Sequence, residues 1–303
     1  MEAIDAIRLN FDQESLVILN ICLAIIMFGI ALDINLRDFK EIARNPRSAV
    51  IGIISQFLAL PFFTFFLILI LEPQPSIALG MILVAACPGG NISNFMSHLS
   101  GANTALSVGL TSISTMLSLV MTPINFQLYG SLNEETEFLL QEIHLGFWEV
   151  FTTVLMIIII PLLLGILVRH RQPKISKLLS PYFRIGSIII FIAFVLVAFS
   201  KNFELFLDYI QYVILLVFAH NSLALLLGNS LGRIWKLPPR DVRTLTIETG
   251  IQNSGLGLVL IFTFFQGLGG MALVAAWWGI WHIISGLAIS FFWSYRKLPV
   301  EKA

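Results

Sequence analysis

The sequence predicts an all-α polytopic membrane protein with about nine transmembrane helices in a single membrane domain over residues 1–303. Hydrophobic residues make up 57% of the chain and charged residues only 12%, roughly half the charged fraction of an average soluble domain. Apolar runs such as 16–32 and 150–168 are long enough, or nearly so, to cross a hydrocarbon core of about 30 Å. Clusters of Lys and Arg lie in alternate loops between the apolar runs.

The predicted spans are of two kinds, continuous and interrupted. The continuous spans lie near 15–34, 46–71, 102–129, 146–168, 181–200, 207–232 and 270–294. The segments 76–100 and 240–267 are also apolar, but each contains glycines and polar residues in mid-span. Because the connections are short, one membrane domain is expected, without a separate soluble domain.

The lysines and arginines indicate which side of the membrane each loop faces. With nine spans, all of the 18 Lys and Arg except Arg8 and Lys201 fall on one side. The loops on the other side collect acidic residues, among them Glu72, Glu134 and Glu135. Because cytoplasmic loops carry the basic excess, the N-terminus is expected outside and the C-terminus in the cytoplasm.

The composition and the motifs also exclude several classes of protein. A net charge of +0 argues against a nucleic-acid partner, and nothing indicates an obligate protein partner. Cys22 and Cys87 lie in apolar segments without metal-ligand spacing, so both are expected to pack as small apolar residues. No nucleophile–base pair and no second deep carboxylate accompany Glu248, so an intramembrane enzyme is not expected.

The first interruption lies in the span 76–100, at the sequence CPGGNISN. Pro88 lacks an N–H donor and clashes with the preceding turn, and the two glycines after it lower the helix preference further. Polar side chains follow at once in mid-span: Asn91, Ser93 and Asn94. Non-helical backbone at that depth is tolerated only where it lines a cavity or is buried in protein.

The second interruption lies in the span 240–267, at TIETGIQNSGLG. In each half of the chain, the interrupted span follows a span with an amide at mid-membrane, Gln56 in one half and Asn221 in the other. Paired interruptions in matching positions are the best sequence indication of a transporter site. The N-terminus of a half-helix favours an anion, and the freed carbonyls favour a cation.

Glu248 is the most informative single residue. A carboxylate near the bilayer centre costs at least ~2.5–3.5 kcal/mol on insertion scales, and no Lys or Arg lies at comparable depth. It is therefore protonated or bound to a cation, with hydroxyls, amides and carbonyls as neutral neighbours. Hard oxygen ligands around one charge favour Na⁺. A proton relay and a structural carboxylic acid are the alternatives.

The span after the first interruption adds hydroxyls on one helix face. Ser107, Thr111 and Ser114 are spaced i, i+4 and i+7 in TALSVGLTSISTML. Back-bonding to carbonyls of the same helix, or helix packing through small residues, would also explain them. Beside the first interruption, Ser107 and Thr111 are favoured as ligands.

Together these motifs resemble the bile acid:sodium symporter family. The resemblance is carried by CPGGNISN, ALSVGLTSIST and TIETGIQNSGLG, and extends to IIMFGIALDINLRDF, IGIISQF and WHIISG. It implies the nine-span form, built from inverted repeats, with a core domain and a panel domain and two interrupted helices that cross. The implied panel helices lie near 15–34, 146–168 and 181–200, and the implied core helices near 46–129 and 207–294.

The resemblance also implies two sodium sites. The first consists of Ser93, Asn94, Ser107, Thr111 and Glu248. The second consists of Gln56, Glu248 and Gln252, with the backbone carbonyls of Thr249 and Ile251. Substrate is expected near the half-helix N-termini, at Asn91 and Asn253, with His282 as a further contact. His220 is a candidate structural hydrogen-bond partner.

The function expected on these grounds is sodium-coupled import of an organic anion by alternating access. The anion is expected to be a bile acid or a small carboxylate, and the partners are sodium ions and the lipid bilayer. The expected location is a bacterial inner (plasma) membrane. The alternative is a proton-coupled or efflux carrier of an organic anion on the same fold.

Overall fold

Helices make up the part of the chain that the structure describes. The structure is a computed structural model, and it describes residues 3–8, 13–33, 46–142, 152, 159–201 and 203–296. Within these residues the only strand-like features are two isolated β-bridges, Arg8–Leu268 and Gly89–Gln252. The all-α class is therefore confirmed.

The helices follow the order of the predicted spans. Those of the first half are α1 (Ala3–Ala6), α2 (Gln13–Asp33), α4 (Pro46–Ile54), the π-helical turn η1 (Ser55–Ala59), α5 (Leu60–Leu71), α6 (Pro75–Ala86), α7 (Ile92–Leu99), α8 (Thr104–Gly130) and α9 (Glu134–Glu142). Those of the second half are α11 (Ile160–Arg171), α12 (Pro173–Lys201), α13 (Phe203–Ile234), α14 (Pro239–Gly250), α15 (Ser254–Phe264) and α16 (Gly269–Ser294). The short helices α1 and α9 are additional to the predicted spans. Most of the predicted span 146–168 before α11 lies outside the described residues.

Several of these helices have the length and composition of membrane spans. Among the described residues, four are long and apolar enough to cross a membrane: Pro46–Leu71, Thr104–Gly130, Leu207–Ile234 and Gly269–Ser294. Two shorter apolar helices, α6 and α15, are each one half of an interrupted span. The chain is an integral membrane protein with several apolar helical spans.

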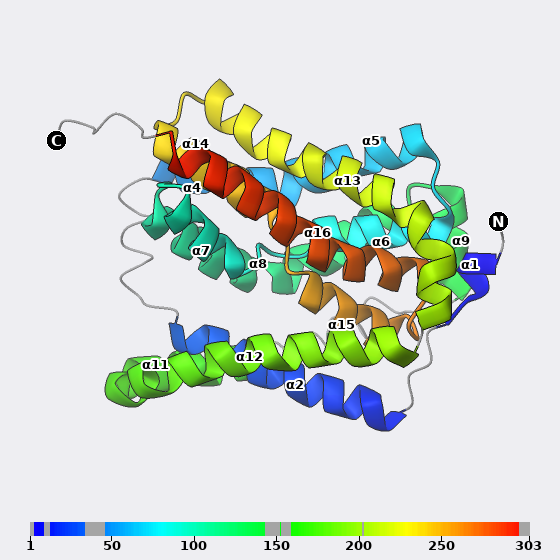
Figure 1. Cartoon of the computed structure of the whole chain (residues 1–303), viewed down its shortest axis with the longest axis horizontal. Coiled ribbons are helices and arrows are strands. Elements are labelled where there is room, and N and C mark those ends of the chain that lie inside the picture. The colour runs from blue at the N-terminus through cyan, green and yellow to red at the C-terminus, as the bar shows by residue number, and fades with distance from the viewer. Residues whose placement is uncertain are drawn as a thin grey trace.

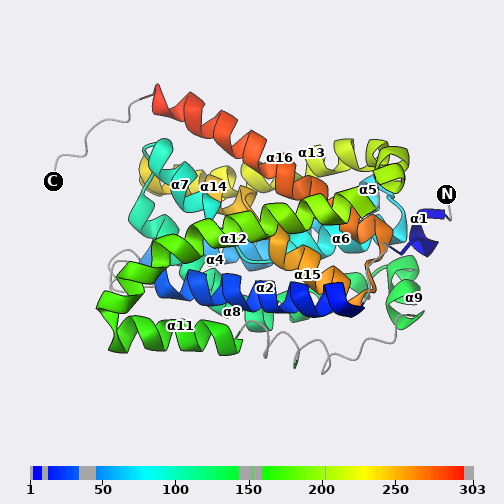
Figure 2. The ribbon, with the colours of Figure 1, turned by 60° about the horizontal axis from the view of Figure 1, so that its bottom comes forward.

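The helices form two groups (Figure 1). α2, α11 and α12 pack on one another, and the other long helices lie together on one side of them. The same three helices lie in front when the molecule is turned (Figure 2). α15 contacts α2 and so joins the two groups. Within the smaller group the packing is close, since a Cβ added at Gly165 of α11 would lie 2.7 Å from the carbonyl oxygen of Phe28 in α2.

The loops of opposite charge lie at opposite ends of the long axis. Figure 1 shows the start of α4, the α11–α12 turn, the α13–α14 turn and the end of α16 at one end, with α1 and α9 at the other. The guanidinium of Arg47, at the start of α4, donates to the carbonyl of Trp235 in the α13–α14 turn at 2.7 Å. The basic turns therefore share one end, while the acidic first turn of α9 lies at the other.

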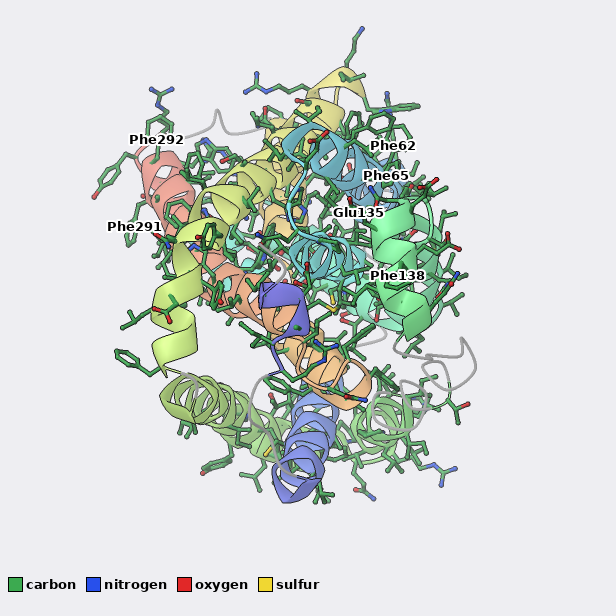
Figure 3. The ribbon with its side chains drawn as sticks, turned by 90° about the vertical axis from the view of Figure 1, so that its right-hand side faces the viewer. Phe62, Phe65, Glu135, Phe138, Phe291 and Phe292 are labelled. Atoms are coloured by element: carbon green, nitrogen blue, oxygen red, sulfur yellow. The ribbon has the colours of Figure 1, made fainter. Side chains whose placement is uncertain are left out.

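Aromatic side chains lie on the outside, and the half-helices α6 and α14 lie inside. A view along the long axis shows Phe62 of α5 on one side of the rim, with Phe291 and Phe292 of α16 on another (Figure 3). All three are about half exposed, as expected of side chains that face lipid. In contrast, α6 is buried from Ser76 to Ala86 and α14 from Asp241 to Gly250. The polar half-helix α14 is thus enclosed by protein.

Candidate functional site

The two helix interruptions lie against each other. The N–H of Gly90, between α6 and α7, donates to the carbonyl of Ile251 at 2.8 Å. The N–H of Asn253, between α14 and α15, donates to the carbonyl of Pro88, also at 2.8 Å. Each unwound segment therefore satisfies backbone groups of the other, as buried backbone in an apolar surrounding requires.

Local sequence explains why the helices stop and restart at these positions. Cys87 ends α6 in an extended conformation (φ −69°, ψ 157°), which is the conformation that a residue before proline prefers. Asn253 restarts α15 as its N-cap, because its Oδ1 accepts from the N–H of Leu256 at 3.0 Å. The last carbonyl of α6, that of Ala86, accepts from Thr122 Oγ1 of α8 at 2.7 Å. This contact gives an otherwise unpaired helix-end carbonyl a partner.

The five side chains expected at the first sodium site lie together, with the other four around the Glu248 carboxylate. Ser93 Oγ donates to Glu248 Oε1 at 2.5 Å, and Ser107 Oγ donates to the same oxygen. Thr111 Oγ1 lies 3.0 Å from Glu248 Oε2. Asn94 Oδ1 accepts from Ser107 Oγ at 2.9 Å. One buried cluster therefore joins α7, α8 and α14.

Ser114, the third hydroxyl on that face of α8, behaves differently. Its Oγ donates to the Thr111 carbonyl of its own helix at 3.1 Å, which is the back-bonding alternative. Gly89 leaves the space into which the Glu248 carboxylate reaches. A Cβ added there would lie 3.0 Å from Glu248 Oε2.

The chemistry of this cluster suits a small monovalent cation. The groups that could bind a cation here are one carboxylate, one amide carbonyl and three hydroxyls, all of them hard oxygen ligands. Glu248 is only 5% exposed, and the recorded partners of its carboxylate are neutral hydroxyls. Within the described residues no three His, Cys, Asp or Glu are grouped to hold a metal ion. The donor set therefore carries one negative charge, which a single Na⁺ would balance.

The residues expected at the second sodium site form a neighbouring cluster. Gln56 Nε2 donates to Gln252 Oε1 at 2.6 Å, and Gln252 Nε2 donates to the Thr249 carbonyl at 2.7 Å. The Ile251 carbonyl, expected as a ligand, accepts from the N–H of Gly90 at 2.8 Å. The recorded hydrogen bonds of the Glu248 carboxylate all come from the first set. The structure thus groups the two glutamines with Thr249 and directs Glu248 to the other cluster.

Gln56 lies in the π-helical turn η1, which the spacing of residues did not predict. Pro61 has no N–H to give to the carbonyl of Phe57 four residues earlier. That carbonyl accepts from Asn125 Nδ2 of α8 at 2.8 Å instead. The sequence signal for this irregularity was Pro61, a proline within the predicted span and four residues after Phe57, the neighbour of the buried amide Gln56. Single π-helical turns of this kind often occur at functional sites.

The three residues expected to contact substrate are placed differently. Asn91 is exposed in the N-cap position of α7, and its side chain makes no capping hydrogen bond. Asn253 occupies the same position before α15, with its Oδ1 bound to the helix it caps. His282 is buried on α16, and its Nδ1 has no hydrogen-bond partner in the structure. The two asparagines therefore flank the junction of the interruptions.

His220 has a structural environment. Its Nε2 lies 2.7 Å from Thr64 Oγ1 of α5, and its ring packs edge-on against Trp278 of α16 at a centroid distance of 4.7 Å. It thus joins α13 to two other helices.

Comparison with known proteins gives a consistent result. The profile described as "Sodium Bile acid symporter family" matches residues 20–209. The chain is 33% identical over 286 residues to "Uncharacterized sodium-dependent transporter YocS" of Bacillus subtilis, with 94% of this chain and 85% of that protein covered. It is 29% identical over 282 residues to "Probable sodium/metabolite cotransporter BASS1, chloroplastic" of Arabidopsis thaliana, covering 92% and 67%.

The similarity extends to animal proteins. The chain is 27% identical over 290 residues to "Sodium-dependent organic anion transporter" of Bos taurus, with 88% of this chain and 74% of that protein covered. It also matches "P3 protein" of Mus musculus, of whose length it spans about half (47%).

Proposed function

The chain belongs to the sodium bile acid symporter family, and from this membership we propose that it is a sodium-coupled symporter that imports an organic anion by alternating access. It is a transporter and not an enzyme. The observation that carries the proposal is the buried Glu248 carboxylate with the oxygens of Ser93, Asn94, Ser107 and Thr111 around it.

The charge of this cluster explains why sodium is needed. Glu248 faces neutral hydroxyls, and a buried carboxylate without a cation is costly. Na⁺ would supply the missing positive charge and bring hydroxyl and amide oxygens of α7 and α8 toward the carboxylate of α14. Since α7 and α14 are halves of the two interrupted spans, the ion would hold the junction in one arrangement. The glutamine cluster of Gln56 and Gln252 offers a second set of oxygens for a second ion.

The organic anion is expected at the same junction. Asn91 and Asn253 stand at the N-termini of the half-helices α7 and α15, where backbone N–H groups and the helix dipole favour negative charge. His282 would be a further contact. The names of two relatives, one an organic anion transporter and one a sodium/metabolite cotransporter, support this substrate class. Because sodium and the anion favour the same arrangement, each would raise the affinity for the other.

The membrane arrangement proposed is a single domain with about nine spans and inverted repeats. The group of α2, α11 and α12 would be the panel and the remaining helices the core, with the two interrupted helices crossing in the core. The gathering of basic turns at one end supports a cytoplasmic C-terminus and an outside N-terminus in a bacterial inner membrane. Movement of the core against the panel would open the junction to each side in turn.

Thermal stability in Na⁺ tests the proposal. The unfolding temperature of the purified protein is expected to rise with NaCl but not with equal KCl, because an ion that binds only the folded state stabilises it by about 2.7 kcal/mol at 100 times its Kd. Glu248→Ala is expected to abolish the Na⁺-dependent rise. Glu135→Ala, which removes an exposed carboxylate on α9, is the matched control. A wild type that does not respond to Na⁺, or a Glu248→Ala variant that responds fully, would contradict sodium coupling.

Uptake into proteoliposomes separates sodium coupling from the proton-coupled alternative. An inward Na⁺ gradient at equal pH on both sides is expected to drive uptake of a radiolabelled organic anion. Uptake driven by a pH gradient in the absence of Na⁺ would support the alternative instead. Anion release favoured over uptake under a physiological gradient would indicate an efflux carrier.

A further inference from the structure

Asn221, the mid-membrane amide of α13, is not part of either expected sodium site, yet it holds the end of α14. Its Nδ2 donates to the carbonyl of Gly250, the last residue of α14, at 2.8 Å. Asn221 is fully buried. The last carbonyls of a helix have no partner within the helix, so this bond fixes the direction of a carbonyl beside the ion-binding residues.

Ser285 of α16 fixes the orientation of that amide. Its Oγ donates to Asn221 Oδ1 at 2.6 Å. An amide could turn by 180° and present its oxygen to Gly250, where two acceptors would face each other. The hydroxyl adds to this preference, because in the observed orientation Ser285 Oγ donates to the amide oxygen while the NH₂ group is directed at the Gly250 carbonyl. A chain of hydrogen bonds therefore runs from α16 through α13 to the interruption.

The contact between α13 and α14 leaves little freedom at this point. A Cβ added at Gly250 would lie 2.8 Å from Leu225 Cγ, one turn after Asn221 on α13. A Cβ added at Gly228, further along the same face, would lie 2.8 Å from the Cα of Thr246. The helices thus pack with backbone close to side chain. Within this contact the Asn221 amide forms a side-chain hydrogen bond to the last residue of α14.

The carbonyls around Gly250 each have a different partner. That of Thr249 accepts from Gln252 Nε2 at 2.7 Å, and that of Ile251 accepts from the N–H of Gly90 at 2.8 Å. The Gly250 carbonyl, between them, is held toward α13. Holding the Gly250 peptide in place therefore helps to fix the directions of its neighbours, the two carbonyls expected as sodium ligands.

We propose that Asn221 and Ser285 form a positioning pair that sets the sodium affinity of the site by holding the end of α14. The proposal rests on the proposed function. Gln56 makes the corresponding bond in the first half of the chain, from its Nε2 to the carbonyl of Cys87 at 2.9 Å. Gln56 is also bound to Gln252 and so belongs to an ion cluster, whereas Asn221 is bound to Ser285. In both halves, therefore, a side-chain amide from the preceding span donates to a carbonyl at the interruption. In the first half this amide also belongs to the glutamine cluster, and in the second half it is bound to Ser285.

Loss of the pair is expected to weaken sodium binding more than it weakens the fold. Without Ser285 Oγ the amide loses the donor that holds its oxygen, and the last turn of α14, which carries Glu248, is held less firmly. Because a hydrogen bond of this kind contributes about 0.5–1.5 kcal/mol and 1.4 kcal/mol corresponds to a factor of ten, Ser285→Ala is expected to raise the Na⁺ concentration for half-maximal thermal stabilisation by about two- to twelvefold. Ser285→Thr keeps the hydroxyl and is expected to restore the wild-type value.

Ser118→Ala is the matched control. Ser118 of α8 is buried, whereas Ser285 is half-buried, and Ser118 Oγ donates to the carbonyl three residues earlier, that of Thr115, at 2.8 Å. Ser285 has the same bond, to the His282 carbonyl at 3.2 Å, in addition to the one to Asn221. Both variants are therefore expected to have similar unfolding temperatures in KCl, and only Ser285→Ala is expected to change the NaCl titration.

A double-mutant cycle tests whether Ser285 acts through Asn221. Asn221→Ala is expected to raise the half-maximal Na⁺ concentration at least as much as Ser285→Ala, and the double variant no more than Asn221→Ala alone. Additive effects would overturn the positioning pair, as would a Ser285→Ala titration equal to those of wild type and Ser118→Ala. These results differ from a wild type without any Na⁺ response, which would overturn the proposed function itself.

Discussion

At the scale of single residues, the site depends on which oxygens can reach one buried carboxylate. Glu248 accepts from Ser93 and Ser107 at one oxygen and lies near Thr111 at the other. Gly89 gives the carboxylate its space. Ser114, one turn beyond Thr111 on the same helix face, bonds only to its own helix. The spacing of hydroxyls along α8 could not separate these roles, because the position of Glu248 along α8 depends on helix packing.

Ser107→Ala tests the role of a single ligand. The variant removes one hydroxyl from the Glu248 carboxylate, and we expect the Na⁺ concentration for half-maximal stabilisation to rise about tenfold or more, which corresponds to about 1.4 kcal/mol. The measurement is an NaCl titration of the unfolding temperature at constant ionic strength. Ser112→Ala is the control, since Ser112 Oγ on the same helix bonds to the Val108 carbonyl at 2.8 Å. Equal titrations of the two variants would remove Ser107 from the ligand set.

At the scale of elements, the interrupted helices are stable because other helices complete their hydrogen bonds. α8 supplies Thr122 to the end of α6 and Asn125 to the π-helical turn η1. α13 supplies Asn221 to the end of α14. An irregular backbone inside a membrane is therefore possible here because the freed carbonyls meet donors, either from the continuous helices α8 and α13 or from the other interruption.

Asn125→Ala tests this support. The change leaves the Phe57 carbonyl without its donor in a buried place, and we expect a loss of about 1–3 kcal/mol in the free energy of unfolding. The Na⁺ response is also expected to weaken, because Gln56 lies in the same turn. Gln127→Ala, an exposed substitution on the same helix, is expected to change the stability by less than about 0.5 kcal/mol. Equal stabilities of the two variants in chemical denaturation would show that Asn125 does not support η1.

At the scale of the whole molecule, the two helix groups and the separation of charge indicate how the protein sits and moves. α15, one half of an interrupted helix, contacts the group of α2, α11 and α12 through α2. A displacement between the groups would therefore reach the junction directly. The two ends of the long axis differ in charge, with basic turns at one end and α9 at the other (Figure 1).

Labelling of introduced cysteines tests the orientation. In intact bacterial cells we expect Glu135→Cys on α9 to react with a membrane-impermeant maleimide, and Arg240→Cys at the start of α14 to react only after permeabilisation. Both positions are exposed. The unmodified protein measures the background from Cys22 and Cys87, of which Cys87 is buried. The reverse pattern would place the N-terminus in the cytoplasm.

The sequence by itself determined the helical class, the positions of the spans that the structure describes and the two interruptions. These are local properties, since an apolar run, a Pro-Gly-Gly segment or a deep carboxylate can be recognised from adjacent residues. All five residues expected at the first sodium site also lie together in the structure.

Only the tertiary structure decided which side chains meet across the interruptions. Ser93 and Glu248 are 155 residues apart in the chain, and Gln56 and Gln252 are 196 apart. Their contact depends on helix packing, as do the support of η1 by Asn125 and the chain from Ser285 through Asn221 to Gly250. The direction of Glu248, toward the hydroxyls of α7 and α8 and not toward the two glutamines, has the same origin. A side-chain hydrogen bond forms only within about 3 Å, and no periodicity along a single helix fixes that distance between two helices.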